Sequence, residues 1–185
     1  MNKKEVKIDF ETFANIQKLV KSSVATDIAR PVLKKIYLQV DEEFISFESC
    51  DGCSAVLQKI EHKQENVEPF TALFYPIDFP KNIKEGYLVF LKEDNILKVK
   101  IKSDKFDVEY KFVQLVEDFV KLDSVIKPHG KFKIAFTPAY LCKLLKNMGK
   151  VCYFIIPEKN TEPLYVQNEN KTAEAVLLPV RYYEK

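Results

Sequence analysis

The sequence has little histidine, glycine or arginine, and each shortage excludes a class of function. Only two histidines are present, His62 and His129, and neither lies near a recognisable nucleophile motif. The four glycines are too few and too scattered for a phosphate-cradling loop. Arg30 and Arg181 are the only arginines, so bidentate reading of base edges is not expected to be the main mode of contact. No catalytic constellation or cofactor is implied, and we expect a protein that is not an enzyme.

Long apolar runs are also lacking. No stretch approaches the roughly 20 apolar residues that a bilayer span needs, and the opening MNKKEVKIDF has no apolar core of a signal peptide. We therefore expect a cytoplasmic protein without a membrane partner. Hydrophobic residues make up 46% of the chain and charged residues 30%, which is ample for a packed core with a charged surface.

The charge balance argues against a broadly basic DNA-binding protein. The formal net charge is only +2, and nearly all basic residues are lysines. If the chain contacts nucleic acid, its positive charge must be concentrated on one face. Lysine favours contacts with phosphates that are independent of base sequence.

Four cysteines are present, and two of them form a CxxC motif, Cys50 with Cys53. That spacing is found in zinc sites and in redox dithiols. A structural zinc site needs a second ligand pair, and Cys142 and Cys152 lack this spacing. The motif also falls at a break between two strands, whereas a thioredoxin-like motif opens a helix. A metal or redox protein is therefore the least favoured class.

The apolar pattern repeats one unit three times, each of roughly 55 to 60 residues: a strand, a helix and three antiparallel strands. In the first unit, residues 5–8 form the strand and Asp9 is the N-cap of a helix over residues 10–24. Further strands are expected over residues 36–40, 44–48 and 55–60. Polar and apolar residues alternate over 44–49, which predicts a strand buried on one face only. An apolar stripe supports the helix: Phe13, Ile16, Val20 and Val24.

The second unit begins near Pro69, and its helix is degenerate because Pro76 and Pro80 oppose a regular helix interior. Its strands are expected over residues 87–92, 96–101 and 105–112. One face of the middle strand is a row of lysines: Lys98, Lys100 and Lys102.

The third unit has the best helix. Thr137 is its N-cap, Pro138 fits the first helical position and Gly149 fits the C-cap region. Strands are expected over residues 151–156, 164–167 and 173–179. The helix has an apolar stripe at helical spacing: Leu141, Leu144, Leu145 and Met148.

Three segments resemble a known family. The stretch RPVLKKIYLQVDEEFISFESCDGCSAV, which starts at Arg30, reads as Arg-Pro, strand, acidic turn, strand ending in Asp51-Gly52, and strand. The stretch AVLLPVRY, which starts at Ala175, is similar to the closing strand and tail of the same family, and residues 118–128 resemble its interdomain linker. In this order, the segments resemble the bacterial sliding clamps, the DNA polymerase III beta subunit family.

The resemblance implies an α+β, DNA-clamp-like fold of repeated strand-helix-three-strand motifs, with antiparallel sheets and helices on one face. A full clamp subunit has three domains of two motifs each, and this chain is half that length. We assign residues 1–128 to one clamp-type domain with a degenerate second helix. Residues 129–185 form a C-terminal half-domain of one motif.

The resemblance also implies a DNA-binding surface. Helices of clamps line a central hole, and their basic residues approach phosphates of double-stranded DNA without reading sequence. The plain alternative is that exposed helix faces of a lysine-rich protein carry lysine in any case. The residues that match this surface are Lys18, Lys21, Arg30, Lys143 and Lys146.

A peptide-binding groove is implied in the same way, between the middle and last domains, for short segments of polymerases and clamp loaders. Cys53-Ser54-Ala55 departs from the family, which has larger residues there, so the pocket is expected to be shallower. The plain alternative is that these residues are strand ends and core. The matching residues are Leu33, Cys50, Gly52, Cys53, Ser54, Ala55, Pro163, Val176 and Leu178.

The function expected from the sequence is that of a compact, homo-oligomeric clamp-like protein in DNA replication or repair. The competing class is an interaction module that never encircles DNA. Such a module would bind clamp-seeking peptides or a full-length clamp.

Overall fold

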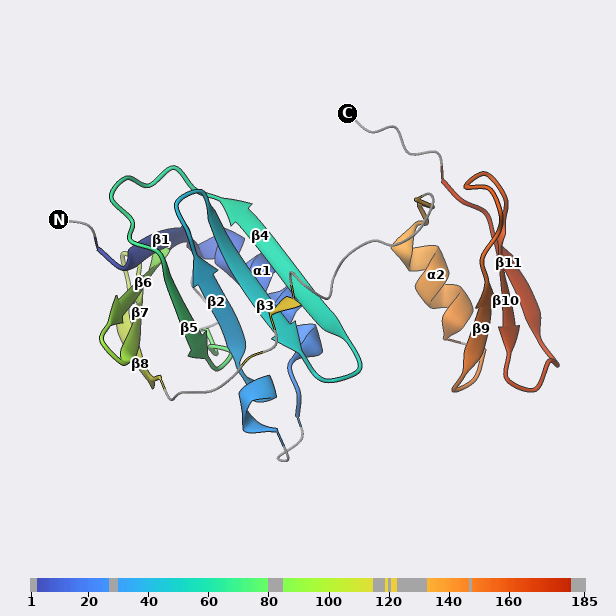
Figure 1. Ribbon diagram of the computed structural model, residues 1–185, viewed down its shortest axis with the longest axis horizontal. Coiled ribbons are helices and arrows are strands. Elements are labelled where there is room, and N and C mark those ends of the chain that lie inside the picture. Colours follow the sequence, from blue (N-terminus) through green and yellow to red (C-terminus); the bar gives the residue numbers. More distant parts are fainter. Residues whose placement is uncertain are drawn as a thin grey trace. The chain divides into compact units, whose positions relative to one another are not determined.

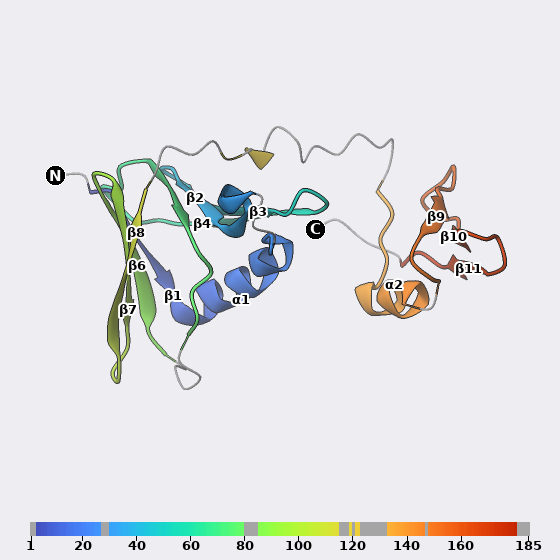
Figure 2. The same cartoon turned by 90° about the horizontal axis from the view of Figure 1, so that it is seen from below.

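The computed structural model describes residues 3–26, 30–79, 85–114, 119, 121–122, 133–146 and 148–180. The segment 118–128 lies largely outside these residues, and Arg181 lies wholly outside them. The chain divides into two compact units, unit 1 (residues 1–127) and unit 2 (residues 128–185). Antiparallel sheets and few helices confirm the predicted α+β class (Figures 1 and 2). Among the described residues, no helix is long and apolar enough to span a bilayer.

Unit 1 contains two four-stranded antiparallel sheets and helix α1 (Phe10–Val20). One sheet has the order β1-β6-β7-β8, with β1 (Glu5–Asp9), β6 (Tyr87–Glu93), β7 (Ile96–Lys102) and β8 (Asp107–Val113). The other has the order β4-β3-β2-β5, with β2 (Ile36–Val40), β3 (Phe44–Cys50), β4 (Ala55–Glu61) and β5 (Phe70–Phe74). Between β5 and β6, residues 75–79 and 85–86 contain no helix.

The two motifs of unit 1 exchange their first strands. β1 begins the first motif, yet it pairs with β6 of the second motif, with Val6 opposite Phe90 and Ile8 opposite Leu88. β5 begins the second motif, yet it pairs with β2 of the first. Figure 1 shows β1 in dark blue beside β6 in green. Each sheet is therefore completed by a strand from the other motif, which ties the two motifs into one domain.

Helix α1 sits where the two sheets meet. It contacts β3 and β4 of one sheet and β1 and β6 of the other. Its apolar side chains Phe13, Ile16 and Val20 are buried, as the predicted stripe requires. They belong to a single core cluster that draws residues from both sheets. The first-strand exchange and the helix together give unit 1 one continuous core.

Side-chain hydrogen bonds fix both ends of α1, and one of them comes from a distant strand. The side chain of Asp9 accepts a hydrogen bond from the Thr12 amide at 2.8 Å, which confirms the predicted N-cap. The helix ends at Val20, not at Val24, and a 3-10 turn follows. The Ser22 hydroxyl donates to the Leu19 carbonyl and the Ser49 hydroxyl donates to the Val20 carbonyl. These bonds satisfy carbonyls that further helical turns would otherwise use.

Strand β3 differs from the prediction because both of its faces are buried over residues 45–49. On the face expected to be solvated, Glu48 is only 1% exposed. Its carboxylate accepts a hydrogen bond from the Leu122 amide at 2.8 Å, and the ring of Phe119 stacks on Tyr37 of the neighbouring strand. A distant segment of the chain thus covers this face, and alternation within the strand cannot reveal it.

Unit 2 contains helix α2 (Pro138–Leu145) and one three-stranded antiparallel sheet of order β11-β10-β9. Its strands are β9 (Cys152–Ile155), β10 (Leu164–Asn168) and β11 (Glu174–Leu177). Thr137 occupies the N-cap position and Pro138 opens the helix, as predicted. The helix ends at Leu145, so Gly149, with φ +89°, lies beyond its cap and not in it. The last strand ends at Leu177, two residues short of the expected end.

Gln17 should contribute strongly to the stability of unit 1. It is buried, its side-chain nitrogen donates to the Ile77 carbonyl at 2.8 Å, and its side-chain oxygen accepts from the Ile77 amide at 2.7 Å. Gln17→Leu leaves both backbone groups unpaired away from water and should cost about 2–4 kcal/mol. Urea unfolding measures this loss. The control is Gln64→Leu, because half-buried Gln64 makes the same pair of bonds to Lys7 where water can reach them, and equal losses would contradict the prediction.

Candidate nucleic-acid and peptide interfaces

The four expected DNA-binding lysines are all solvent-exposed, two in each unit. Lys18 lies on the outer face of α1, and Lys21 follows the helix directly. Lys21 forms an ion pair with Asp78, with 3.6 Å between Nζ and Oδ1. Lys143 and Lys146 lie at the end of α2. Every one of these ammonium groups can therefore reach an external phosphate, although that of Lys21 is shared with a carboxylate.

The two helices differ in charge. The exposed face of α1 carries Glu11 as well as Lys18. Helix α2 has no acidic residue, and exposed Tyr140 stands one turn before Lys143. A tyrosine next to lysines suits a polyanion, because the ring offers contact area and the hydroxyl a hydrogen bond. Tyr140 was not among the site residues predicted from the sequence, although its three-residue spacing from Lys143 places both on one face.

Arg30 connects the two expected interfaces. It precedes the 3-10 turn η2 (Pro31–Lys34), and its side chain is exposed. Its Nη1 atom lies 3.3 Å from the point where a Cβ would stand on Gly52. Gly52 has φ +91°, a backbone conformation that side chains disfavour. Glycine here permits both the turn and the approach of the guanidinium group.

The turn between β3 and β4 is built around Asp51. Its Oδ1 accepts hydrogen bonds from the amides of Ser54 at 2.6 Å and Cys53 at 2.8 Å. These bonds, that of Ser54 foremost, hold the pKa of the Asp51 carboxyl below its usual range. The Ser54 hydroxyl also contacts the Ser23 hydroxyl at 2.9 Å. The turn is thus fixed to the end of the α1 segment and presents Cys53, Ser54 and Ala55 to solvent.

The other expected peptide-binding residues are placed unevenly. Leu33 is buried, and its carbonyl accepts from the Ala25 amide at 2.9 Å, so it serves the core of unit 1. Cys50 is half-buried at the end of β3. In unit 2, Pro163 is exposed, and Val176 and Leu178 are 60% and 70% exposed. Each unit therefore offers apolar surface of its own at the residues the resemblance identifies.

Two of the three lysines in the row on β7 are paired with carboxylates. Lys98 is hydrogen-bonded to Glu93, and Lys100 lies 3.4 Å from Glu109. Lys111 also pairs with Glu109, and these two lysines, Lys111 first, lower the pKa of the Glu109 carboxyl. Carboxylates on the neighbouring strands thus neutralise much of the row.

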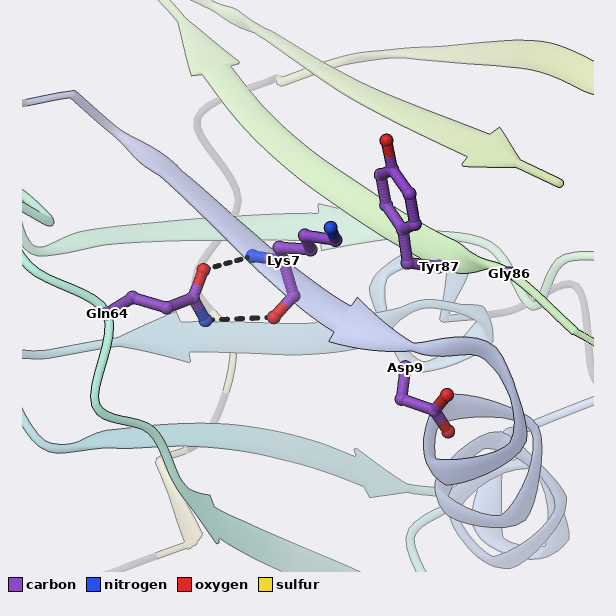
Figure 3. A pocket seen from close by; sticks show the side chains of 5 residues that line it. All are labelled: Lys7, Asp9, Gln64, Gly86 and Tyr87. Carbon is purple, nitrogen blue, oxygen red and sulfur yellow. Dashed lines mark hydrogen bonds between the residues drawn. The ribbon is translucent and has the colours of Figure 1, made fainter.

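A hollow of about 470 Å³ lies on unit 1 beside β1 and β6 (Figure 3). The side chains of Lys7, Gln64 and Asp9, which line it, already have partners. The Lys7 ammonium lies 3.5 Å from the centre of the Tyr87 ring, Gln64 bonds to the Lys7 backbone, and Asp9 caps α1. It contains no nucleophile or convergent set of unpaired groups, and sequence reasoning assigned nothing to it. None of the predicted site residues lines it.

The cysteines Cys50, Cys53, Cys142 and Cys152 are all free thiols. Within the described parts of the chain, no group of three His, Cys, Asp or Glu side chains could hold a metal ion. The CxxC motif lies in the β3–β4 turn, not at the start of a helix.

In unit 1 the two motifs exchange their first strands and one helix packs across both sheets. The chain has a DNA-clamp-like fold, as similarity to solved bacterial sliding clamps shows. A sliding clamp from Bacillus subtilis matches with a TM-score of 0.72 at 12% identity, over 95% of this chain and 49% of that one. A clamp from Pseudomonas aeruginosa gives 0.73 at 11%, over 97% and 52%. The DNA polymerase III beta chain from Streptococcus pneumoniae gives 0.71 at 12%, over 98% and 50%.

At these identities the likeness establishes the fold. The chain spans about half the length of the clamps it matches and so has the fold of a shortened clamp. No family model matches the sequence, and no curated protein matches it by sequence.

Proposed function

We propose that the protein is a sliding-clamp-like factor of DNA replication or repair. It associates with double-stranded DNA without sequence specificity and docks short peptides of polymerase or clamp-loader partners. Its role is not enzymatic, and it acts in the cytoplasm as a homo-oligomer. Residues 1–128 are the clamp-type domain and residues 129–185 the half-domain. The observation that supports this best is the clamp fold itself, matched over 95% of the chain.

The charge distribution supports the DNA part of the proposal. With a net charge of +2, attraction to DNA must come from local surfaces. Exposed lysines stand on both helices, and α2 has no acidic residue to oppose them. Such contacts bind phosphates and leave base edges unread.

Retention on circular DNA tests the proposed mode of action. A clamp that encircles duplex stays on a closed circle after a salt wash and leaves when the circle is cut. If the salt wash removes the protein equally from circular and linear duplex, the protein does not encircle DNA. The proposed DNA binding is then limited to an electrostatic association.

The peptide-docking part predicts the effect of one substitution. Leu178→Asp places a charge on the expected groove and should weaken binding of a clamp-binding peptide at least about tenfold, because docking would bury an unpaired carboxylate. Leu178 is 70% exposed, so the fold should persist. Calorimetric titration measures the affinity. Val113→Asp is the matched control, since Val113 is an apolar residue on β8 with 61% exposure. Equal effects of both substitutions would refute the groove.

A second candidate function is an interaction module that never encircles DNA and binds clamp-seeking peptides or a full-length clamp. The observation that favours it is the charge of α1, where Lys18 shares the exposed face with Glu11 and Lys21 pairs with Asp78. Peptide binding without retention on circular DNA is the result that identifies this function.

A further inference from the structure

Among its described residues, the third motif shows no strand exchange of the kind that completes each sheet of unit 1. In unit 1, β6 and β2 each begin a three-stranded run and each receives the first strand of the other motif. Their core-facing residues Leu88, Phe90, Ile36 and Leu38 are all 0% exposed. In unit 2, β9 occupies the corresponding place at the end of the order β11-β10-β9. In the described part of the chain, β9 pairs only with β10.

Apolar side chains of β9 remain exposed beside its edge, which is unpaired among the described residues. Phe154 pairs with Val166, which is fully buried against the α2 side of the sheet, so both residues face that side. Phe154 is nevertheless 44% exposed, and Ile156, two residues further along, is 64% exposed. An open strand edge with exposed apolar side chains is a template for another strand.

Helix α2 shows the same incompleteness. In α1, Phe13, Ile16 and Val20 are buried because the helix packs on two sheets. No residue of α2 is buried. Its leucines contact the single sheet of unit 2 and remain partly exposed. The helix therefore has apolar surface for a second sheet.

Unit 2 also carries a segment outside its helix and its sheet, at the place where β1 stands in unit 1. Residues 133–136, here called the leading segment, precede α2 as β1 precedes α1. Counted back from the helix N-caps, Ile134 and Phe136 correspond to Val6 and Ile8, the core-facing residues of β1. Ala135 accepts a hydrogen bond from the Val180 amide at 2.8 Å, after β11. The segment thus lies by the chain that leaves β11, with β10 between β11 and β9, so it does not reach its own β9.

A corresponding contact exists in unit 1. There Lys7, which like Ala135 stands two residues before the helix N-cap, bonds the Gln64 side chain through its backbone amide and carbonyl. Lys7 stands opposite Val89 of β6 at the same time. The contact between Ala135 and Val180 is therefore compatible with pairing of the leading segment to a β9 strand elsewhere.

We propose that two copies of this chain associate through unit 2, each giving its leading segment to the β9 edge of the other. The occupant is a second copy because unit 2 holds both complementary parts, the donor segment and the open edge, so the contact closes as a two-fold dimer. Antiparallel pairing in the unit 1 register sets Phe136 opposite Cys152, Ala135 opposite Tyr153 and Ile134 opposite Phe154 of the other copy. This inference rests on the homo-oligomer part of the proposed function and names its surface.

The first test compares two substitutions on one strand. Phe154→Glu puts a charge on the face to be buried, and Ile155→Glu puts the same charge on the opposite face at similar exposure, 55% against 44%. By sedimentation, the wild type should form a dimer of about 43 kDa, twice the chain mass of 21.5 kDa. Phe154→Glu should weaken the dimer at least about tenfold, and Ile155→Glu should leave it intact. A monomeric wild type overturns the proposal, as does a dimer that only Ile155→Glu disrupts or that neither change affects.

The second test does not depend on the folding of Phe154→Glu. With the four native cysteines replaced by alanine, Ala135→Cys with Tyr153→Cys should give a disulfide-linked dimer on mild oxidation, because opposed strand residues lie within disulfide range. Each single substitution should stay uncrosslinked. Absence of the crosslink in a chain that still dimerises would show another surface and would leave the homo-oligomer part of the proposed function standing.

Discussion

Phe13→Ala is expected to lower the free energy of unfolding of unit 1 by about 3–5 kcal/mol, the range for removing a buried aromatic ring. The side chain is 0% exposed. Its ring centre lies 5.5 Å from that of Phe47 on β3, 6.3 Å from that of Phe74 on β5 and 5.2 Å from that of Phe90 on β6. These strands belong to both sheets, so the alanine leaves a cavity where the exchanged motifs join.

Guanidinium unfolding followed by circular dichroism measures the loss. The matched control is Leu19→Ala on the same helix, because Leu19 is 48% exposed and should cost less than about 1 kcal/mol. A cost for Phe13→Ala close to that of the control would mean that the core is not organised around this ring. A change in the denaturant slope would instead indicate a less compact native or denatured state.

Local signals predicted the elements of unit 1 well. The carboxylate of Asp9 had one plausible use before an amphipathic helix, and it caps α1. Alternation placed the strands β2 to β4 and β6 to β8 within a few residues of their observed bounds, whereas β5 was given no bounds from the sequence. Polar residues at strand ends and apolar residues at every second position arise within a single strand, without any distant partner. Such patterns can therefore be recognised in the sequence.

Signals that join distant residues were not visible. Alternation along β3 predicted one solvated face, yet Glu48 is buried because it binds the amide of Leu122, 74 residues away. The helix end at Val20 depends on Ser49 of another strand. The pairing of β1 with β6 could not be predicted from periodicity either. The alternation of polar and apolar residues in a strand is the same whichever of the two sheets the strand joins. Such facts come from packing of the whole domain.

Some features of the candidate sites were predictable from local sequence, and others depend on residues from distant segments. Exposure of Lys18, Lys143 and Lys146 follows from their places off the apolar stripes, and it was predictable. The ion pair between Lys21 and Asp78 was not, because these residues come from separate segments. The approach of Arg30 to Gly52 also needed the fold. Residue type and spacing therefore identify candidates, while their partners decide how much charge or apolar surface each still offers.

Reversing the charge of Lys18, Lys21, Lys143 and Lys146 to glutamate is expected to abolish binding to duplex DNA while the fold survives. All four side chains are exposed, so their replacement should cost little stability. If each neutralises one phosphate, the wild-type affinity should fall with salt with a log–log slope of about −3.6, because about 0.9 counterion is released per phosphate. Fluorescence anisotropy with duplexes of unrelated sequence measures both effects, and affinities should agree between the duplexes.

A control of equal charge separates local contacts from net attraction. Replacing Lys63, Lys105, Lys150 and Lys159 by glutamate changes the net charge from +2 to −6, as the helix variant does, at exposed positions outside α1 and α2. Binding should persist in the control at low salt and be absent in the helix variant. Equal loss in both would mean that overall charge alone governs the association. Unchanged binding in the helix variant would place any DNA contact elsewhere on the molecule, because the four ammonium groups of the two helices are the proposed phosphate ligands.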